Sequence, residues 1–527
     1  MTSIIEPARN IPIAHDVDVV VAGGGAAGFA AAVAAAREGA STVLVESFGT
    51  LGGCMSVGGW NAGGFSIKDL NYEKFRKTGW SGYLTYLATK QEVGDETLDQ
   101  MRTCGLAGEW MTKIFDMDDD YGPRHNLADT ANRIGYICGQ MVHEAGVTMM
   151  LNTYAADVIQ GEDRVVRGLI VENTSGRQAI RAKVVIDATA NAAIAARSGA
   201  PLMDNNWEPS LNITFGYGNI DAEKWQKFVA QRPEVPAEFN EWIDNELLPQ
   251  AGYTWFRVFA HINRLRPIAD LVRQAQENDG YHAIGKISEA GRIALVFPWE
   301  GGKAPQNGMY WGRADIDGKI DTLSAEDMTM VEREARRYLM ETGQFFRKYL
   351  PGFENCYLLY SSAYIGKRGG RAIEAERVIT PEDMFAARRL DDVISLHDDS
   401  RYHTAHKPRG GMHDPDELNQ PTDIPYRQLL PKRVENLLAA GVSAHRKPPN
   451  IRERTTVIVM GQAAGIAATI AARQDVFVRD IDVRHLQRRL QEEGVYLGPA
   501  EHVEALLKTP AKTSLSGPKN RSFPPIK

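Results

Sequence analysis

Residues 17–46, VDVVVAGGGAAGFAAAVAAAREGASTVLVE, decide the fold of this chain. The segment opens with Val17–Val21, which is apolar at nearly every position and predicts a strand buried on both faces of a parallel sheet. Phe29–Arg37 is rich in alanine and predicts a helix, which Gly39 ends. Thr42–Val45 then predicts a second strand. Strand, helix and strand in this order predict a βαβ unit.

Three glycines with GxGxxG spacing connect the first strand to the helix. Gly23 permits a tight turn, Gly25 has no side chain to keep a pyrophosphate from the backbone, and Gly28 lets helix and strand pack closely. The helix N-terminus offers unpaired N–H groups and the positive end of a dipole. These features predict a phosphate-binding turn.

An acid follows the second strand at the distance that a nucleotide site requires. Glu46 lies eighteen residues after Gly28, where a carboxylate can accept hydrogen bonds from an adenosine ribose. The glycine spacing alone is weak evidence, because glycine-rich turns also arise by chance. Combined with the strand, the helix and the acid in register, it predicts dinucleotide binding.

A second glycine-rich stretch, residues 47–65 (SFGTLGGCMSVGGWNAGGF), follows directly. Its glycines, Gly52 and Gly53 first among them, favour a backbone that lies flat against a bulky planar ligand over a mobile surface loop. Cys54 lies inside this stretch and could approach or covalently attach to such a ligand. A small buried thiol without a bond to the ligand is the preferred interpretation.

Length and composition set the class of protein. A chain of 527 residues is too long for one hydrophobic core, so two or three lobes are expected. Apolar residues make up 43% and charged residues 24%, as in ordinary soluble globular proteins. The net charge of −7, with both signs interspersed, argues against nucleic acid as a partner.

The cysteines and the N-terminus predict a cytoplasmic protein. Cys54, Cys104, Cys138 and Cys356 form no CxxC or CxxxxC pair, which disfavours a zinc site, an iron–sulfur cluster or a redox disulfide. The N-terminus, MTSIIEPARNIPIAHD, has no apolar core of signal-peptide length, and no run is expected to span a bilayer. We therefore expect a reducing compartment and no membrane partner.

Further strands and helices are predicted downstream. Residues 146–159, GVTMMLNTYAADVI, predict a strand pair, and Val165–Glu172 with Ile180–Ile186 predicts a β-hairpin or meander with its turn at Ser175–Gly176. Residues 324–350 predict a charged amphipathic helix that starts in a capping-box arrangement at Ser324.

The motifs together resemble those of the FAD-dependent oxidoreductase family. The resemblance rests on VVVAGGGAAG, VESFGTLGG, RAKVVIDATA, VENLLAAGVSA and RERTTVIVMGQAAGIAA. The wider relatives are the fumarate reductase and succinate dehydrogenase flavoproteins. The resemblance implies an α/β fold, with a Rossmann-like FAD-binding domain of the glutathione-reductase type and an inserted α+β substrate-binding lobe.

The resemblance implies FAD contacts along most of the chain. The residues concerned are Gly23, Gly25, Ala26, Ala27, Gly28, Glu46, Gly52, Gly53, Cys54, Ala155, Ala156, Ala188, Thr189, Gly441, Arg452, Thr456, Gly461, Gln462 and Ala463. A helix beginning near Gly461 would aim its N-terminal dipole at the flavin N1–O2 edge, while its alanines and glycines also suit close helix packing. Two motifs depart from the family, because its ATG-Asp reads Ala188-Thr189-Ala190-Asn191 and its AGR reads Ala440-Gly441-Val442.

The expected division of the chain follows from these motifs. The FAD-binding domain spans 1–205 and 431–508, the inserted lobe spans 206–360, an active-site segment spans 361–430, and 509–527 is a C-terminal tail. The lobe is rich in aromatic residues, with His261, Arg264 and Arg266 among them. As an insertion in a cofactor fold it is the natural place for substrate, although most of its aromatic residues are expected to form its own core.

A cationic cluster supplies the candidate catalytic residues. Arg368 and Arg371 match an arginine pair of the family, and the segment RYHTAHKPRGGMH adds His403 and His406, with His413 the weaker candidate. Arginines can orient a carboxylate or carbonyl, and a histidine can transfer a proton near neutral pH. A solvated loop and a metal site are the alternatives, and no carboxylate or cysteine spacing supports a metal.

The predicted function is that of an FAD-dependent oxidoreductase, which transfers a hydride between a small organic substrate and flavin N5. The alternatives are a flavin-dependent monooxygenase and an electron-transfer subunit of a larger complex. A second GxGxxG motif is missing, so no domain for tightly bound NAD(P)H is predicted, and the electron donor or acceptor stays unknown. A homo-oligomer is compatible with this prediction.

Overall fold

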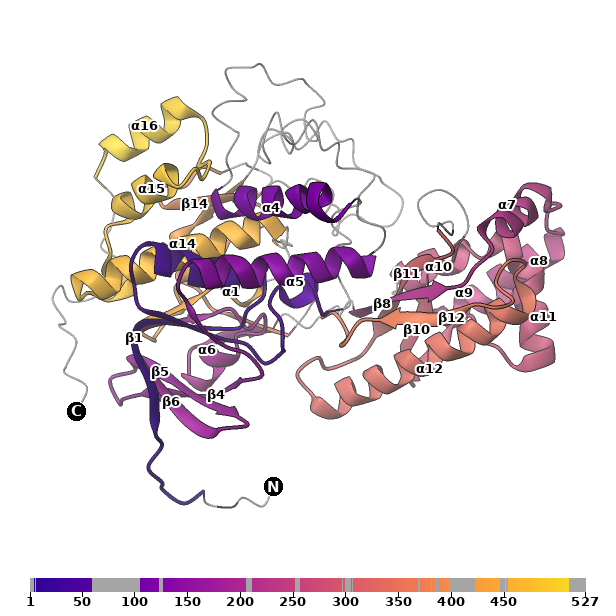
Figure 1. Ribbon diagram of the computed structural model, residues 1–527, viewed down its shortest axis with the longest axis horizontal. Coiled ribbons are helices and arrows are strands. Elements are labelled where there is room, and N and C mark those ends of the chain that lie inside the picture. The colour runs from indigo at the N-terminus through magenta and orange to yellow at the C-terminus, as the bar shows by residue number, and fades with distance from the viewer. Residues whose placement is uncertain are drawn as a thin grey trace.

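The computed structural model describes residues 4, 6–58, 105–122, 127–204, 211–251, 256–295, 297–298, 305, 307–367, 370–380, 382–383, 386, 388–397, 422–445, 451 and 454–510. Within them lie a larger α/β core and a lobe that extends to one side of it (Figure 1). Each has its own cluster of buried apolar side chains.

The larger core is built on a mixed sheet that, within the described residues, has seven strands in the order β3-β2-β1-β6-β5-β4, with β16 also paired to β6. The strands are β1 (Ile13–Ala22), β2 (Thr42–Val45), β3 (Thr148–Met150), β4 (Tyr154–Gln160), β5 (Val166–Asn173), β6 (Gly176–Asp187) and β16 (Leu437–Ala439). β1 pairs in parallel with β2 and β6, whereas β4, β5 and β6 are antiparallel. The predicted Rossmann-like sheet is confirmed.

One sequence expectation about this sheet is wrong. The segment 146–159 does form strands, but β3 pairs with β2 at one edge and β4 pairs with β5 at the other. A turn therefore separates two strands that never meet, because β3 extends the parallel part of the sheet and β4 starts the antiparallel meander. The alternation of apolar residues marks each strand and carries no information about its partner.

Two apolar helices pack on this sheet with backbone in contact. They are α1 (Ala26–Arg37) and α14 (Arg454–Gln474), and nearly all their side chains are buried. A Cβ added at Gly461 would lie 2.1 Å from the carbonyl oxygen of Ala27, and one at Gly465 would lie 2.2 Å from that of Ala31. Glycine at these two positions is what lets the helices approach so closely.

By length and composition alone, α14 is apolar enough to cross a membrane, contrary to the expectation that no such run exists. It is completely buried inside the protein, as a core helix is. Within the described residues, the larger core also contains the helices α4 (Gly105–Tyr121), α5 (Leu127–Glu144), α6 (Ala193–Arg197), α15 (Val483–Glu492) and α16 (Ala500–Lys508).

Two strand pairs complete the larger core. β7 (Leu202–Asp204) pairs with β13 (Arg371–Ile373), and β14 (Val393–His397) pairs with β15 (Thr422–Pro425). Both pairs bring parts of the segment after residue 361 back onto the larger core, because β13 lies against the turn Gly441–Ala444 and β14 lies against α14.

The lobe contains an antiparallel sheet that, in the described residues, has five strands in the order β12-β8-β11-β10-β9. They are β8 (Leu211–Gly218), β9 (Gly285–Ser288), β10 (Gly291–Leu295), β11 (Tyr310–Gly318) and β12 (Tyr357–Ser361). Its helices are α7 (Ala222–Gln231), α8 (Ala237–Trp242), α9 (Leu248–Ala251), α10 (Phe256–Asn263), α11 (Ala269–Asp279) and α12 (Ala325–Tyr349). The predicted inserted lobe of mixed α and β structure is confirmed.

The two faces of the lobe sheet differ in chemistry. Phe215 and Tyr217 lie on an apolar face under α12, and the Tyr217 hydroxyl donates to the carbonyl of Leu339 in that helix. α12 itself begins as predicted, because the Ser324 hydroxyl accepts from the N–H of Asp327. Asn212 and Asp315 lie opposite each other on the other face. On that second face Asn212 and Asp315 are buried although they are polar, and Arg313 and Asp317 are partly exposed.

Candidate functional site

The phosphate-binding end of the site lies between β1 and α1. Gly23 has a φ of 97°, and a Cβ at Gly28 would come within 1.7 Å of the Gly23 carbonyl oxygen, so both positions require glycine. Gly25 differs, because the nearest described atom to a Cβ there would be Cα of Gly53 at 3.9 Å. Space is therefore open at Gly25, where the pyrophosphate is predicted.

The N-terminus of α1 is available to an anion. Gly25 is its N-cap residue and makes no side-chain capping hydrogen bond, and the first turn contains no acidic residue. The N–H groups of this turn therefore carry the positive end of the helix dipole without a side chain to neutralise it. An uncapped helix start beside open space fits a phosphate group.

Glu46 holds the two glycine-rich segments together. Its Oε2 accepts from the N–H of Gly24 at 2.7 Å, and its Oε1 accepts from the N–H of Phe48 at 2.9 Å and from the Ser47 hydroxyl at 3.0 Å. A carboxylate has about four acceptor positions, so one is left for a ribose hydroxyl. Glu46 is 6% exposed and lies at the carboxyl end of β2, where the sequence placed it.

The second glycine-rich segment returns to the phosphate turn. The N–H of Gly52 donates to the carbonyl of Gly24 at 2.8 Å, and Gly53 begins a short 3-10 turn that contains Cys54. The Sγ of Cys54 lies 3.6 Å from the hydroxyl of Tyr364. Tyr364 also stacks on Phe48 at 4.7 Å between ring centroids, and its burial raises the pKa of its hydroxyl well above the usual value.

Asp187, at the end of β6, accepts hydrogen bonds from two further segments of the site. Its Oδ1 accepts from the Thr189 hydroxyl at 2.7 Å, and its Oδ2 accepts from the N–H groups of Ile194 and Ala195 at the start of α6. The Ser443 hydroxyl also donates to Oδ1, at 3.2 Å. The Ala188–Asn191 turn and the Gly441–Ala444 turn, which depart from the family's usual motifs, are thereby held side by side.

Arg371 reaches the same turn. Its Nε donates to the carbonyl of Asn191 at 3.3 Å, and Arg371 itself is half-buried at the start of β13. Gly441 has a φ of 65°, and a Cβ there would lie 3.1 Å from Cβ of Ala27. The structure thus gathers the phosphate turn, Ala188, Thr189, Gly441 and Arg371 around one region.

Other predicted FAD contacts make protein contacts of their own. The Thr456 hydroxyl donates to the carbonyl of Leu396, Oε1 of Gln462 accepts from the N–H of Leu106, and the carbonyl of Ala156 accepts from Arg197. Ala155 and Ala156 lie on β4, whose start is next to Glu46 because the N–H of Thr153 donates to the Glu46 carbonyl.

The expected helix start at Gly461 is wrong. α14 begins at Arg454, so Gly461, Gln462 and Ala463 lie well inside it and cannot supply N–H groups from a helix N-terminus. Residues 455–460 are buried, and the helix that contains them packs against α1, α4, β6 and β14. For Gly461 the close packing against α1 is the role that the structure supports.

Four predicted residues, Arg368, His403, His406 and Arg452, lie outside the described residues, as does His413. The structure does show what precedes and follows the histidine segment. β14 ends at His397 and β15 begins at Thr422, and the two strands pair from Val393 to Pro425. The histidine segment therefore leaves and re-enters the core at one hairpin.

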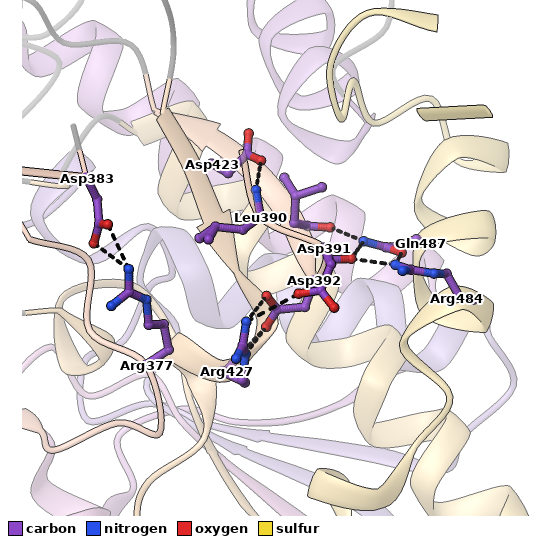
Figure 2. A network of polar contacts seen from close by, with 10 residues as sticks. Arg377, Asp383, Leu390, Asp391, Asp392, Asp423, Arg427, Arg484 and Gln487 are labelled. Carbon is purple, nitrogen blue, oxygen red and sulfur yellow. Dashed lines mark hydrogen bonds and ion pairs between the residues drawn. The ribbon is translucent and has the colours of Figure 1, made fainter. Parts of the chain in front are cut away.

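A network of partly buried ion pairs and hydrogen bonds anchors that hairpin (Figure 2). Arg427 forms a two-pronged contact with Asp392, at 2.7 and 2.8 Å, and the amide of Gln487 in α15 donates to the carbonyl of Asp391. Asp423, at the start of β15, accepts from the N–H of Leu390 at 2.7 Å. The base of the hairpin is thus tied to a helix of the larger core.

Burial dominates the electrostatics of Asp423. It raises the pKa of this carboxyl to about 6, although Arg389 lies 2.7 Å away and the Leu390 N–H favours the charged form. The network therefore contains one carboxyl that titrates close to neutral pH.

Sequence reasoning missed a polar cluster on the lobe sheet. His261 in α10 places Nε2 2.6 Å from Oδ2 of Asp315 in β11, and Nε of Arg313 lies 3.0 Å from the same oxygen. Asn212, opposite Asp315 on β8, is fully buried. The available signal was the alternation of polar residues in LNIT (Asn212, Thr214) and in RADID (Arg313, Asp315, Asp317), in strands that are buried or half-buried along their length.

The described residues of this region fit FAD. Open space at Gly25, the uncapped N-terminus of α1 and the remaining acceptor position of Glu46 suit pyrophosphate and ribose. Within the part of the chain that the structure describes, no group of three or more His, Cys, Asp or Glu side chains could hold a metal ion. Burial raises the pKa of the Cys138 thiol to about 12 and that of Cys356 to about 11, so both are neutral.

Comparison with known proteins gives a family match over nearly the whole chain. A family model described as FAD dependent oxidoreductase matches residues 18–490. No curated protein sequence matches.

Solved structures are similar at low identity. A geranylgeranyl bacteriochlorophyll reductase-like protein from Thermoplasma acidophilum is 13% identical, with 94% of this chain and 89% of that one covered and a TM-score of 0.38. The flavin-dependent brominase Bmp2 is 12% identical, with 90% and 83% covered and a TM-score of 0.36. The p-nitrophenol 4-monooxygenase PnpA from Pseudomonas putida DLL-E4 is 14% identical, with 93% and 84% covered and a TM-score of 0.32.

Proposed function

The chain belongs to the FAD-dependent oxidoreductase family, and we propose that it transfers a hydride between a small organic substrate and FAD. FAD supplies the redox chemistry when bound, by hydride exchange at flavin N5. The chain supplies a site that orients the cofactor, excludes water and presents a substrate.

The observation that carries this proposal is the junction between the glycine-rich segment and the lobe. The N–H of Ala363 donates to the carbonyl of Val57, and Gly58 forms an isolated bridge with Tyr364. Two residues on, Gly366 exchanges hydrogen bonds with Asn212 at the start of β8. The polar face of the lobe therefore begins next to the described part of the segment expected to lie against the flavin, which supports a substrate site between the two.

The Arg/His cluster remains part of this proposal. Arg371 contributes a half-buried guanidinium beside the Ala188–Asn191 turn, and guanidinium groups bind carboxylates and carbonyls in fixed geometry. The histidine segment is carried by a hairpin whose strand β14 touches α14 through Thr456. We infer that His403 or His406 holds or moves the proton that accompanies the hydride.

Anaerobic mixing of the yellow holoprotein with a panel of metabolites tests the proposal. A substrate of a dehydrogenase bleaches the flavin absorbance without oxygen, whereas a compound that only binds shifts the spectrum without bleaching it. If no compound bleaches the flavin anaerobically, and turnover appears only with oxygen and an external reductant, the protein is a monooxygenase and the proposed function is wrong.

A further inference from the structure

We propose that Asn212, His261 and Asp315 form a binding site for a neutral, hydroxyl-bearing molecule on the polar face of the lobe sheet. This inference rests on the proposed function, because it names the class of substrate that the enzyme would take. None of the three residues belongs to the predicted Arg/His cluster or to the FAD contacts.

The first step is the burial of Asn212. It is 0% exposed, and neither its Oδ1 nor its Nδ2 has a hydrogen-bond partner in the described structure. A buried amide without partners costs about 1–3 kcal/mol for each unsatisfied group, and native proteins contain few of them. A side chain of this kind is explained when a ligand supplies the missing partners.

A second unsatisfied group belongs to the same cluster. His261 is 4% exposed and its Nε2 contacts Asp315, while its Nδ1 is buried and has no partner among the residues that the structure describes. Asp315 lies directly opposite Asn212 in the β8–β11 pair, which places their side chains on one face, about 5 Å apart at Cβ. Two groups with unmet hydrogen bonds thus surround one carboxylate.

The pattern of donors and acceptors indicates what would fit. Nε2 of His261 faces the carboxylate of Asp315, which can only accept, so Nε2 carries a hydrogen and Nδ1 is the ring nitrogen left for a ligand. The amide of Asn212 offers both a donor and an acceptor. A hydroxyl group both donates and accepts, so adjacent hydroxyls on a ligand satisfy both residues.

The charges favour a neutral ligand. Oδ2 of Asp315 also contacts Nε of Arg313, so the cluster already pairs one carboxylate with one guanidinium. A further anion would lie beside the buried carboxylate, and a cation would compete with Arg313 and His261 for it. An alcohol, a polyol or a sugar meets the hydrogen-bonding demand without adding a charge.

The cluster is held by rigid elements, as a binding site requires. α10 lies on this face, since the N–H of Val258 donates to Asp317 and His261 contacts Asp315. At its other end the face adjoins Gly366 and, through Ala363 and Val57, the glycine-rich segment. A molecule bound at Asn212 would therefore lie at the end of the lobe sheet that faces the cofactor domain.

The experiment measures binding separately from turnover. The thermal midpoint of the holoprotein is measured with D-glucose, myo-inositol and glycerol as probes, and with succinate as the hydroxyl-free anion. We expect at least one neutral hydroxylated probe to raise the midpoint of the wild type and succinate to leave it unchanged. Asn212→Leu should weaken that binding about tenfold or more, with FAD content unchanged.

Two comparisons keep the test decisive. Thr342→Val changes an equally buried polar residue of α12, on the apolar side of the sheet, and should bind the probe like the wild type. Asn212→Ala serves if the leucine variant does not fold. The unpaired buried amide of Asn212 destabilises the folded protein when no ligand is bound. Asn212→Leu should therefore have a higher thermal midpoint than the wild type in the absence of a probe.

The outcomes separate this inference from the proposed function. Binding of a hydroxylated probe that depends on Asn212, without bleaching of the flavin by any compound, would support the site and reject the hydride-transfer proposal. Bleaching by compounds without hydroxyl groups, or bleaching that Asn212→Leu leaves at the wild-type rate, would overturn the site and leave hydride transfer standing. No binding by any hydroxylated probe would mean that the cluster holds only water, and would also overturn it.

Discussion

At the scale of single residues, Gly25 and Gly28 belong to one motif but are required for different reasons. A Cβ at Gly28 would collide with the Gly23 carbonyl, whereas one at Gly25 meets no described atom closer than 3.9 Å. We therefore expect Gly25→Val to fold and to purify without FAD, because the side chain fills the space that the pyrophosphate needs. Gly28→Val should instead lose the fold.

Far-UV circular dichroism and the flavin-to-protein absorbance ratio distinguish these two results. A folded Gly25→Val protein with one FAD per chain would show that the phosphate lies elsewhere.

A second prediction at this scale concerns proton transfer. His403→Ala or His406→Ala, at whichever position holds the proton, should slow anaerobic flavin reduction by about a hundredfold with FAD content unchanged. Arg371→Ala should instead weaken substrate binding, by about 2 kcal/mol or more for a buried ionic contact. Stopped-flow titration of the reduction rate against substrate concentration separates the two effects. Wild-type reduction rates and wild-type substrate affinity in all three variants would show that the cluster is only a solvated loop with no part in catalysis.

At the scale of elements, the close contact between α1 and α14 requires glycine at particular positions of α14. Gly465→Ala adds a methyl group 2.2 Å from the Ala31 carbonyl oxygen, and we expect it to destabilise the protein by about 2 kcal/mol although alanine is the better helix former.

Gly139→Ala in α5 is the matched control, because no described atom lies within 4 Å of its added Cβ. The control should stabilise the protein by about 0.5–1 kcal/mol. Urea unfolding of both variants measures the difference. If Gly465→Ala and Gly139→Ala changed the free energy of unfolding equally, α1 and α14 would be able to move apart without loss of stability.

The β14–β15 hairpin gives the protein a pH-dependent stability. The folded pKa of Asp423 is about 6, above its ordinary value of 3.8, so between these pH values the unfolded chain gives up the proton that the folded chain keeps. The free energy of unfolding therefore falls as pH rises through this window. Each pH unit is worth about 1.4 kcal/mol, so the loss is about 3 kcal/mol and is complete above pH 6.

Asp423→Asn tests this, since the amide oxygen can still accept from the N–H of Leu390. Unfolding free energies of this variant should lack the fall between pH 4 and pH 6. The same fall in variant and wild type would assign it to another group.

At the scale of the whole molecule, the sequence predicted the cofactor core far better than the substrate region. The turn at Gly23, the acid at Glu46 and the segments ending at Thr189 and Gly441 carry motifs whose spacing reflects backbone geometry, and such motifs can be read one segment at a time. The cluster of His261 and Asp315 could not be read in this way. It depends on the register of the strands and on a contact between His261 and Asp315, which are 54 positions apart in the sequence. Neither feature leaves a signal in a short stretch of sequence.

The cofactor site also links the segments that lie far apart in the chain, which leads to the last prediction. FAD contacts are expected from the phosphate turn, from the segment Glu46–Cys54 and from the turns at Thr189 and Gly441, so unfolding of the larger core separates them all. In the part of the chain that the structure describes, the neighbour of the Cys54 Sγ is the Tyr364 hydroxyl at 3.6 Å, which offers no positive charge to activate the thiol toward the flavin.

We therefore expect non-covalent FAD, which acid precipitation releases completely into the supernatant. A ligand that binds only the folded state stabilises it, by about 2.7 kcal/mol at a hundred times its Kd, so removal of FAD should lower the thermal midpoint and added FAD should restore it. Cys54→Ala should keep both the colour and this response. Yellow colour that stays in the acid pellet of the wild type and is lost from that of Cys54→Ala would show instead that the thiol is bonded to the flavin.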